Sequence, residues 1–168
     1  MPKNQRPVNI RRNIENWGDP YIQAANPQEI KICSECQAVL HDQRWYLKEQ
    51  MSRELLRDPG IKSTICPACR KTRDRLPGGI VHLSGTFLGT HKEEILNLIR
   101  NENERAMSVN PLERIIDIET VNSGVDVLTT NEKLAQRIGR ALHKAYSGEV
   151  EYKWSENNKL ARVNWVRE

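Results

Sequence analysis

Apolar stretches of two kinds alternate along the second half of the chain. In residues 92–107 and 131–146 the apolar positions recur at helical spacing, which indicates helices with one buried side. Shorter runs of strand-forming residues lie around them and are bounded by Gly, Pro and Asn. The predicted strands lie at residues 80–84, 112–119, 125–128, 149–154 and 160–166. This β-α-β-β-α-β-β order predicts an α+β domain of the ferredoxin-like kind with one added strand.

The second of these helices carries boundary signals. Thr129 and Glu132 have the spacing of a capping box, in which each side chain accepts a hydrogen bond from the backbone N–H of the other residue. Gly148 follows the last apolar position and predicts the end of the helix. We therefore expect this helix to be defined at both ends.

The first half of the chain is less regular. Residues 1–28 contain four prolines and no periodic apolar pattern, which predicts a flexible basic arm. Residues 29–40 and 44–47 then predict a short hairpin. Residues 47–57 predict a helix, which the Asp-Pro-Gly sequence after it ends.

Composition and charge favour a division of the chain at Leu76-Pro77-Gly78-Gly79. A hydrophobic content of 38% is lean for one packed core in 168 residues, so we expect a metal-stabilised module at residues 29–76 and an α/β domain at residues 77–168. Residues 1–76 contain 14 Lys/Arg and 9 Asp/Glu, whereas the remainder contains 12 and 13. A basic front half suits a polyanionic partner, although solvated basic surfaces are also common.

The four cysteines of the chain form two C-x-x-C pairs, Cys33 with Cys36 and Cys66 with Cys69. Two such pairs supply the four thiolates of a tetrahedral, structural zinc site. The 29 residues between the pairs exceed the usual 15–20 of this pattern, and the predicted helix at residues 47–57 fills the gap. We therefore predict one structural Zn²⁺ held by all four cysteines.

Other interpretations of the cysteines remain open at this point. A redox-active C-x-x-C would follow a strand at a helix start, and a disulfide framework would suit a secreted protein. His41 is an alternative ligand close to Cys36. The N-terminus resembles no signal peptide, and no apolar run approaches 18 residues, so we expect a cytoplasmic protein in a reducing compartment.

Basic residues gather on the second predicted helix and beside the second cysteine pair. Those of the helix repeat at spacings of 4, 3 and 4 and project within one narrow sector, about a third of a turn from an apolar stripe. Such a row either contacts phosphates or is a solvated helix face. The candidate nucleic-acid-binding residues are Arg70, Lys71, Arg73, Lys133, Arg137, Arg140 and Lys144.

Catalytic chemistry finds little support in the sequence. No histidine has a carboxylate, Ser or Cys partner at the spacing of a catalytic motif, and the Gly-containing segment at residues 85–90 lacks the Lys of a phosphate loop. Tyr152, Trp154 and Trp165 lie on predicted strands, where we expect them to pack in the core. We therefore expect a protein that is not an enzyme.

The cysteine pairs and several later motifs carry a resemblance. With Leu83-Ser84-Gly85-x-Phe87-Leu88, residues 95–102 and residues 135–142, the chain resembles small bacterial proteins in which a zinc ribbon precedes an α/β domain. More distantly, its knuckles and Gly124-Val125-Asp126 resemble the N-terminal half of the export adaptor family of the large ribosomal subunit. That family has more cysteine pairs than this chain, so the resemblance implies binding of RNA or a ribosomal particle but no role in export.

The expected function is therefore binding of RNA or a ribosomal particle by a zinc-containing, cytoplasmic protein. Two alternatives stay open. One is a protein–protein interaction adaptor in which the zinc is purely structural, and the other is a thiol-based redox protein.

Overall fold

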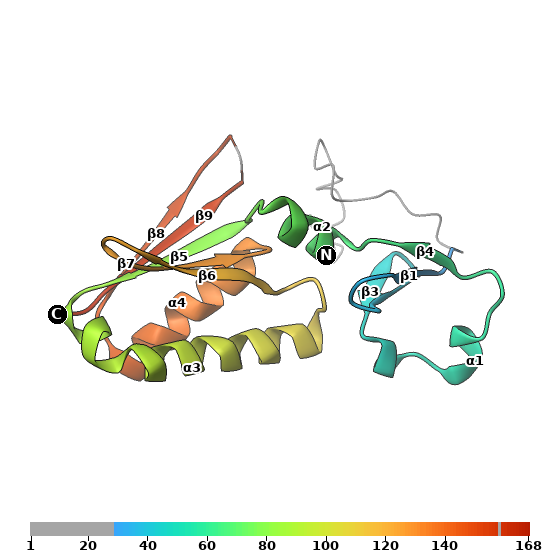
Figure 1. Cartoon of the computed structure of the whole chain (residues 1–168), viewed down its shortest axis with the longest axis horizontal. Coiled ribbons are helices and arrows are strands. Elements are labelled where there is room, and N and C mark those ends of the chain that lie inside the picture. Colours follow the sequence, from blue (N-terminus) through green and yellow to red (C-terminus); the bar gives the residue numbers. More distant parts are fainter. Residues whose placement is uncertain (1–28, 158) are drawn as a thin grey trace, which may run out of the picture.

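The computed structural model describes residues 29–157 and 159–168, and the predicted basic arm at residues 1–28 lies outside the described residues. Within the described part, the chain is a mixed α/β protein with two sheets, and Figure 1 shows the smaller sheet beside the larger, helix-backed one. No helix of the described part is long and apolar enough to cross a membrane.

The two cysteine pairs lie at the ends of two strands, β1 and β4, of the smaller sheet. Its strand order is β3-β2-β1-β4, in which β1 and β4 are parallel and the other neighbours antiparallel. Asp42 and Gln43 connect β2 and β3 through a tight turn with φ values of 48° and 62°. This confirms the predicted hairpin. The strands are β1 (Lys31–Cys33), β2 (Val39–His41), β3 (Arg44–Tyr46) and β4 (Lys62–Thr64).

The single helix predicted at residues 47–57 is wrong. The segment instead forms a 3-10 turn, η2 (Lys48–Gln50), and a one-turn helix, α1 (Arg53–Leu56). Met51 and Ser52 between them are extended, and the Ser52 side chain accepts a hydrogen bond from the Leu55 N–H. Serine favours such a cap over a helix interior, which explains the interruption.

A helix that was not predicted, α2 (Pro67–Asp74), joins the two sheets. Cys66 is its N-cap and Pro67 its first residue, where the missing N–H of proline costs no hydrogen bond. Arg75 ends the helix in the left-handed region with φ 51°. The sequence had pointed only to a basic run here.

The larger sheet follows the predicted order of elements. Its strand order is β6-β7-β5-β9-β8, and β9 lies parallel to β5 while the other neighbours are antiparallel. The α/β class is thus confirmed, whereas the exact ferredoxin-like topology is not, because β9 separates β8 from β5. The elements are β5 (Gly79–Ser84), α3 (Thr86–Val109), β6 (Ile115–Val121), β7 (Gly124–Thr129), α4 (Glu132–Tyr146), β8 (Glu149–Trp154) and β9 (Ala161–Val166).

Both long helices begin differently from the prediction. α3 begins six residues early and bends at His91, and Phe87 in its first turn stacks on His91 and lies under the Arg167 guanidinium. The predicted capping box of α4 is wrong. Asn131 caps this helix by accepting a hydrogen bond from the Leu134 N–H, while the buried Thr129 hydroxyl donates to backbone carbonyls.

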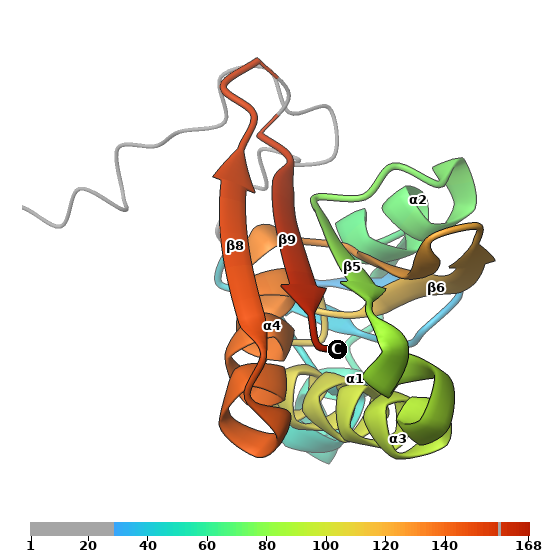
Figure 2. The same cartoon turned by 90° about the vertical axis from the view of Figure 1, so that its left-hand side faces the viewer.

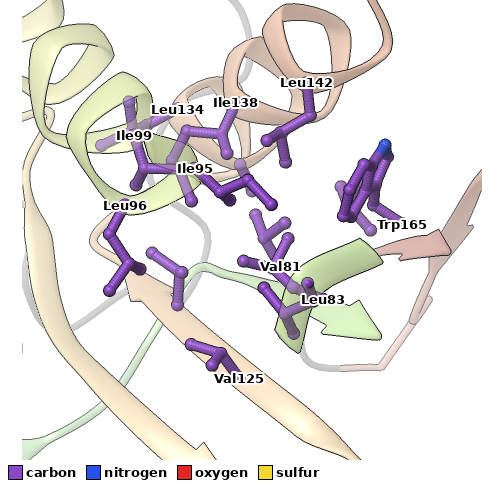
Figure 3. Packing of buried hydrophobic residues seen from close by; sticks show 14 of the residues in the cluster. Val81, Leu83, Ile95, Leu96, Ile99, Val125, Leu134, Ile138, Leu142 and Trp165 are labelled. Carbon is purple, nitrogen blue, oxygen red and sulfur yellow. The ribbon is translucent and has the colours of Figure 1, made fainter. Parts of the chain in front are cut away.

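The main core lies between α3, α4 and one face of the larger sheet (Figure 3). Leu134, Ile138 and Leu142 of α4 pack there against side chains of α3 and the strands. Trp165 is fully buried, as predicted, whereas Tyr152 and Trp154 are 42% and 56% exposed. Core packing is therefore wrong for these two aromatic residues.

Candidate metal centre

The parallel pair β1–β4 brings the two cysteine pairs together. Cys33 is the last residue of β1, and Cys66 follows β4 after a single intervening residue. Since the register aligns Cys33 with Thr64, both strands end at the same edge of the sheet. The Ser34 N–H donates to the Thr64 carbonyl at 2.8 Å and holds the two ends side by side.

Each pair is shaped by local backbone geometry. After Cys36 the chain turns through Gln37, whose φ of 65° is left-handed, and the Cys33 N–H donates to the Ala38 carbonyl at 2.8 Å. At the second pair the Cys69 N–H donates to the Cys66 Sγ at 3.4 Å in the first turn of α2. This N–H and the positive end of the helix favour the thiolate of Cys66, but the hydrogen bond with Cys36 and burial outweigh them and raise the pKa of the Cys66 thiol.

The four sulfurs have the separations of a metal-binding tetrahedron. All four Sγ atoms lie within 4.8 Å of one another, with 3.8 Å between Cys33 and Cys69 and 3.7 Å between Cys36 and Cys66. With Zn–S bonds of about 2.3 Å, the edge of a ZnS₄ tetrahedron is about 3.8 Å. The four cysteines are free rather than disulfide-bonded. The donor set therefore fits one tetrahedral metal ion, and the disulfide interpretation is wrong.

His41 lies apart from this cluster. It is the last residue of β2, its Nδ1 lies 3.5 Å from the Asp42 carboxylate, and the group of metal-binding side chains found in the described part contains only the four cysteines. Nothing in the structure supports the alternative ligand.

Arg114 from the α/β part completes the surroundings of the sulfurs. Its guanidinium donates to the Sγ atoms of Cys36, Cys66 and Cys69 at 3.2, 3.3 and 3.4 Å. Its Nε donates to the Pro111 carbonyl at 2.7 Å, which orients the group. The sequence contains no signal for this contact, because Arg114 lies 45 residues beyond Cys69 and outside any motif.

The electrostatics of the cluster follow from these contacts. The hydrogen bond to Cys66, aided by Arg114, lowers the pKa of the Cys36 thiol, while that same bond and burial raise the pKa of Cys66. Burial opposes the charge of Arg114, but attraction by Cys36 and Cys66 outweighs it and raises the pKa of the guanidinium. Four thiolates around a divalent ion would leave two negative charges, of which Arg114 would neutralise one.

Thr130 connects the metal centre to the larger sheet. Its hydroxyl accepts a hydrogen bond from the Arg114 N–H at 2.9 Å and donates to the Leu112 carbonyl, and its own carbonyl accepts from Lys71 Nζ at 3.1 Å. Leu112 also packs against the cluster of buried cysteines. Lys71, a predicted nucleic-acid-binding residue, is thus a contact between the two parts of the chain.

The other basic residues divide into paired and exposed ones. Arg73 pairs with Asp74 at 3.3 Å, Arg70 is half-buried on α2, and Arg137 pairs with Glu102 of α3 at 2.7 Å. The remaining residues of the predicted row on α4 are exposed, and no ion pair of theirs occurs within residues 29–157 and 159–168. These are Lys133, Arg140 and Lys144.

The larger sheet brings together one further group that motif spacing did not reveal. His82 Nδ1 lies 2.5 Å from the Asp126 carboxylate, and its Nε2 lies 3.4 Å from the Ser123 hydroxyl. This order of contacts is that of a serine hydrolase triad. The Ser123 side chain is exposed in the turn between β6 and β7. We interpret the group as a hydrogen-bonded row across the sheet.

No model of a known protein family matches this chain, and no curated protein matches it. The resemblance to zinc-ribbon proteins and to the export adaptor family therefore stays a prediction.

Proposed function

We propose that the four cysteines hold one structural Zn²⁺ ion. The single observation that carries this proposal is the tetrahedral spacing of the four Sγ atoms, 3.7 and 3.8 Å for two opposite edges. Thiolate ligands favour Zn²⁺ over harder cations, and four of them complete its coordination. Bound zinc would leave no position for water or substrate, so its role would be to hold the module in shape.

Elemental analysis of the purified chain tests the metal. We expect one zinc per chain in the wild type and a loss of most of it in Cys66→Ser, because three thiolates bind zinc far more weakly than four. His41→Ala is the matched control and retains the zinc. A wild-type chain without zinc whose thiols cycle through a disulfide would instead support the thiol-redox alternative.

The same proposal assigns RNA as the partner, without an enzymatic activity. Its support is the exposed part of the α4 row, Lys133, Arg140 and Lys144, which project away from the sheet and keep their charges available. Neutralising a phosphate releases counterions, so each contact adds salt-dependent affinity.

Binding of a structured RNA at several salt concentrations tests this assignment. Reversing Lys133, Arg140 and Lys144 together to Glu should weaken binding and make the negative slope of log K against log salt shallower by about 2 to 3. The control reverses Lys48, Arg53 and Arg57 of the small module, an equal change of charge on a different exposed surface. An equal loss in both variants would mean that only the total charge matters.

A pull-down with and without nuclease separates RNA from protein partners. Recovery of RNA that disappears with nuclease agrees with the proposal. A protein that stays bound after nuclease, in the absence of RNA binding, would identify the chain as an interaction adaptor.

A further inference from the structure

Strand β8 is an edge of the larger sheet with unusual exposure. Within residues 29–157 and 159–168 its one neighbouring strand is β9, and Figure 2 shows it along the outer side of the sheet. Five of its six residues are exposed, among them Tyr152 and Trp154. An exposed edge presents unpaired backbone N–H and C=O groups that another strand can bind.

The two edges of the sheet differ in their protection. The β6 edge contains an irregularity between Ile115 and Asp117, and such bulges hinder strand addition. The β8–β9 pairing runs in continuous register from Glu149 to Trp154. Neither proline nor glycine interrupts β8. It is therefore the edge that is better suited to accept a strand.

The side chains of β8 alternate between an apolar and a charged face. Val150, Tyr152 and Trp154 lie opposite buried residues of β9, on the side where α4 packs, and the Tyr152 ring approaches Gly139 of that helix. Glu149, Glu151 and Lys153 lie on the other face. Lys153 stands opposite Arg162 of β9, so a like charge already flanks it on the inner side.

Among the antiparallel registers in which at least three residues of β8 pair with β8 of a second copy, only one satisfies these charges. Centred on Tyr152, it places Glu151 opposite Lys153 twice and Val150 opposite Trp154 twice. Centring it on Glu151 or on Lys153 sets two like charges directly opposite each other, and centring it on Val150 sets Glu149 opposite Glu151. Opposite charges across strands stabilise a sheet and like charges destabilise it.

We infer that β8 is a self-association edge, through which two copies of this chain join their sheets around a two-fold axis at Tyr152. The contact is isologous, so each favourable pair occurs twice. Tyr152 would then be covered by Tyr152 of the second copy, and Trp154 by Val150 of the second copy, on the side of the sheet where α4 packs. This inference is independent of metal binding and of RNA binding.

Charge exchange at β8 in the full-length chain tests the inference by sedimentation. Glu151→Lys and Lys153→Glu should each weaken the dimer about tenfold or more, because both symmetric pairs become repulsive. An equimolar mixture of the two variants should restore dimerisation as a heterodimer, since every cross-strand pair is then attractive. This rescue does not depend on the Glu151–Lys153 contact within one chain, at 3.0 Å, which both variants lose.

Glu149→Lys is the matched control, because the register places Glu149 opposite the uncharged Ser155. It should change the dissociation constant by no more than about twofold. A wild type that stays monomeric at millimolar concentration overturns the inference and leaves the edge to a strand of a different protein. A mixture that associates no better than the single variants, or a Glu149→Lys variant as weak as Glu151→Lys, also overturns it.

Discussion

Arg114 is the residue whose position explains most about the metal centre. A cation with five N–H donors in a rigid plane suits a group of sulfurs better than a lysine, whose charge is compact and strongly hydrated. The three N–H···S contacts cover one side of the cluster and offset part of its negative charge. Both functions depend on the planar shape of the guanidinium as well as on its charge.

We predict that replacing Arg114 loosens the centre in a graded manner. Arg114→Met removes the charge and all donors, and should lower the free energy of unfolding by about 1.5–3 kcal/mol, the range for hydrogen bonds to charged groups. Arg114→Lys keeps the charge but not the fork, so zinc release to a chromogenic chelator should be slowest in the wild type, intermediate in Lys and fastest in Met. Equal release rates in all three proteins would contradict this role.

At the residue scale the sequence predicts ligands but not their surroundings. The cysteine ligands can be recognised from the sequence because the fixed spacing within each pair is a local property. Arg114 contacts them through tertiary structure, with its backbone held by hydrogen bonds to Thr130 in both directions. Similarly, Lys71 and Arg137 have no local sign of their partners Thr130 and Glu102, which lie 59 and 35 residues away.

Among the elements, α4 has a side-chain N-cap, as the sequence predicts, but a different residue provides it. The helix occupies the predicted residues, yet its cap is Asn131 instead of Thr129. Thr129 is the last residue of β7 and is fully buried, where its hydroxyl bonds the Gly79 and Asn131 carbonyls. Pairing in the sheet thus removes Thr129 from the helix terminus.

The cap yields a stability prediction. Asn131→Ala should lower the free energy of unfolding by about 1 kcal/mol, because the Leu134 N–H loses its acceptor. Asn131→Asp keeps an acceptor and adds a negative charge at the positive end of the helix, so it should unfold at or above the wild-type denaturant concentration. Urea unfolding followed by circular dichroism measures both. An Ala variant as stable as the wild type would assign the cap elsewhere.

Short elements are predicted less well than long ones for a physical reason. A stretch of four to eight residues provides few periodic positions, so a single cap such as Ser52 or Cys66 decides its structure. The 24-residue α3 has ample periodicity in its middle, and only its first turn, fixed by the contact between Phe87 and Arg167, was missed.

On the scale of the whole molecule, the two hydrophobic cores are of different kinds. The main core consists of aliphatic side chains and Trp165. The second consists of Cys33, Cys66 and Cys69 with two alanines, so its buried residues are largely the metal ligands themselves. Such a core contributes little hydrophobic stabilisation without the ion, because a small module buries too little apolar surface.

Metal removal should therefore unfold only one part of the chain. We predict that a strong chelator exposes the amides of β1 and β4 to rapid hydrogen exchange, while those of β5, β7 and β9 stay protected. Exchange measured by mass spectrometry or NMR resolves the two sheets, and re-addition of zinc should restore protection. Simultaneous loss of protection in both sheets would show that the chain unfolds as one unit.

The order of helices and strands along the chain could be predicted from the sequence, but the order of the strands within the larger sheet could not. Alternating apolar patterns give the succession of strands and helices, because each pattern is local. Strand order depends on pairing between distant segments, and nothing in β8 or β9 alone says that β9 takes the place next to β5. Because β9 lies next to β5, β8 forms the edge of the sheet, and Tyr152 and Trp154 are exposed there rather than buried in the core.

The parallel alignment of β1 and β4 has a consequence for how this chain can vary. The connection between them contains η2 and α1, neither of which buries a residue, and Figure 1 shows α1 at the far end of the small module. Doubling the length of such a loop costs only about 0.6 kcal/mol in closure entropy. Insertions between Tyr46 and Lys62 are therefore nearly neutral for the sulfurs. The number of residues between the cysteine pairs can therefore increase at little cost, whereas the number of residues within each pair is fixed at two.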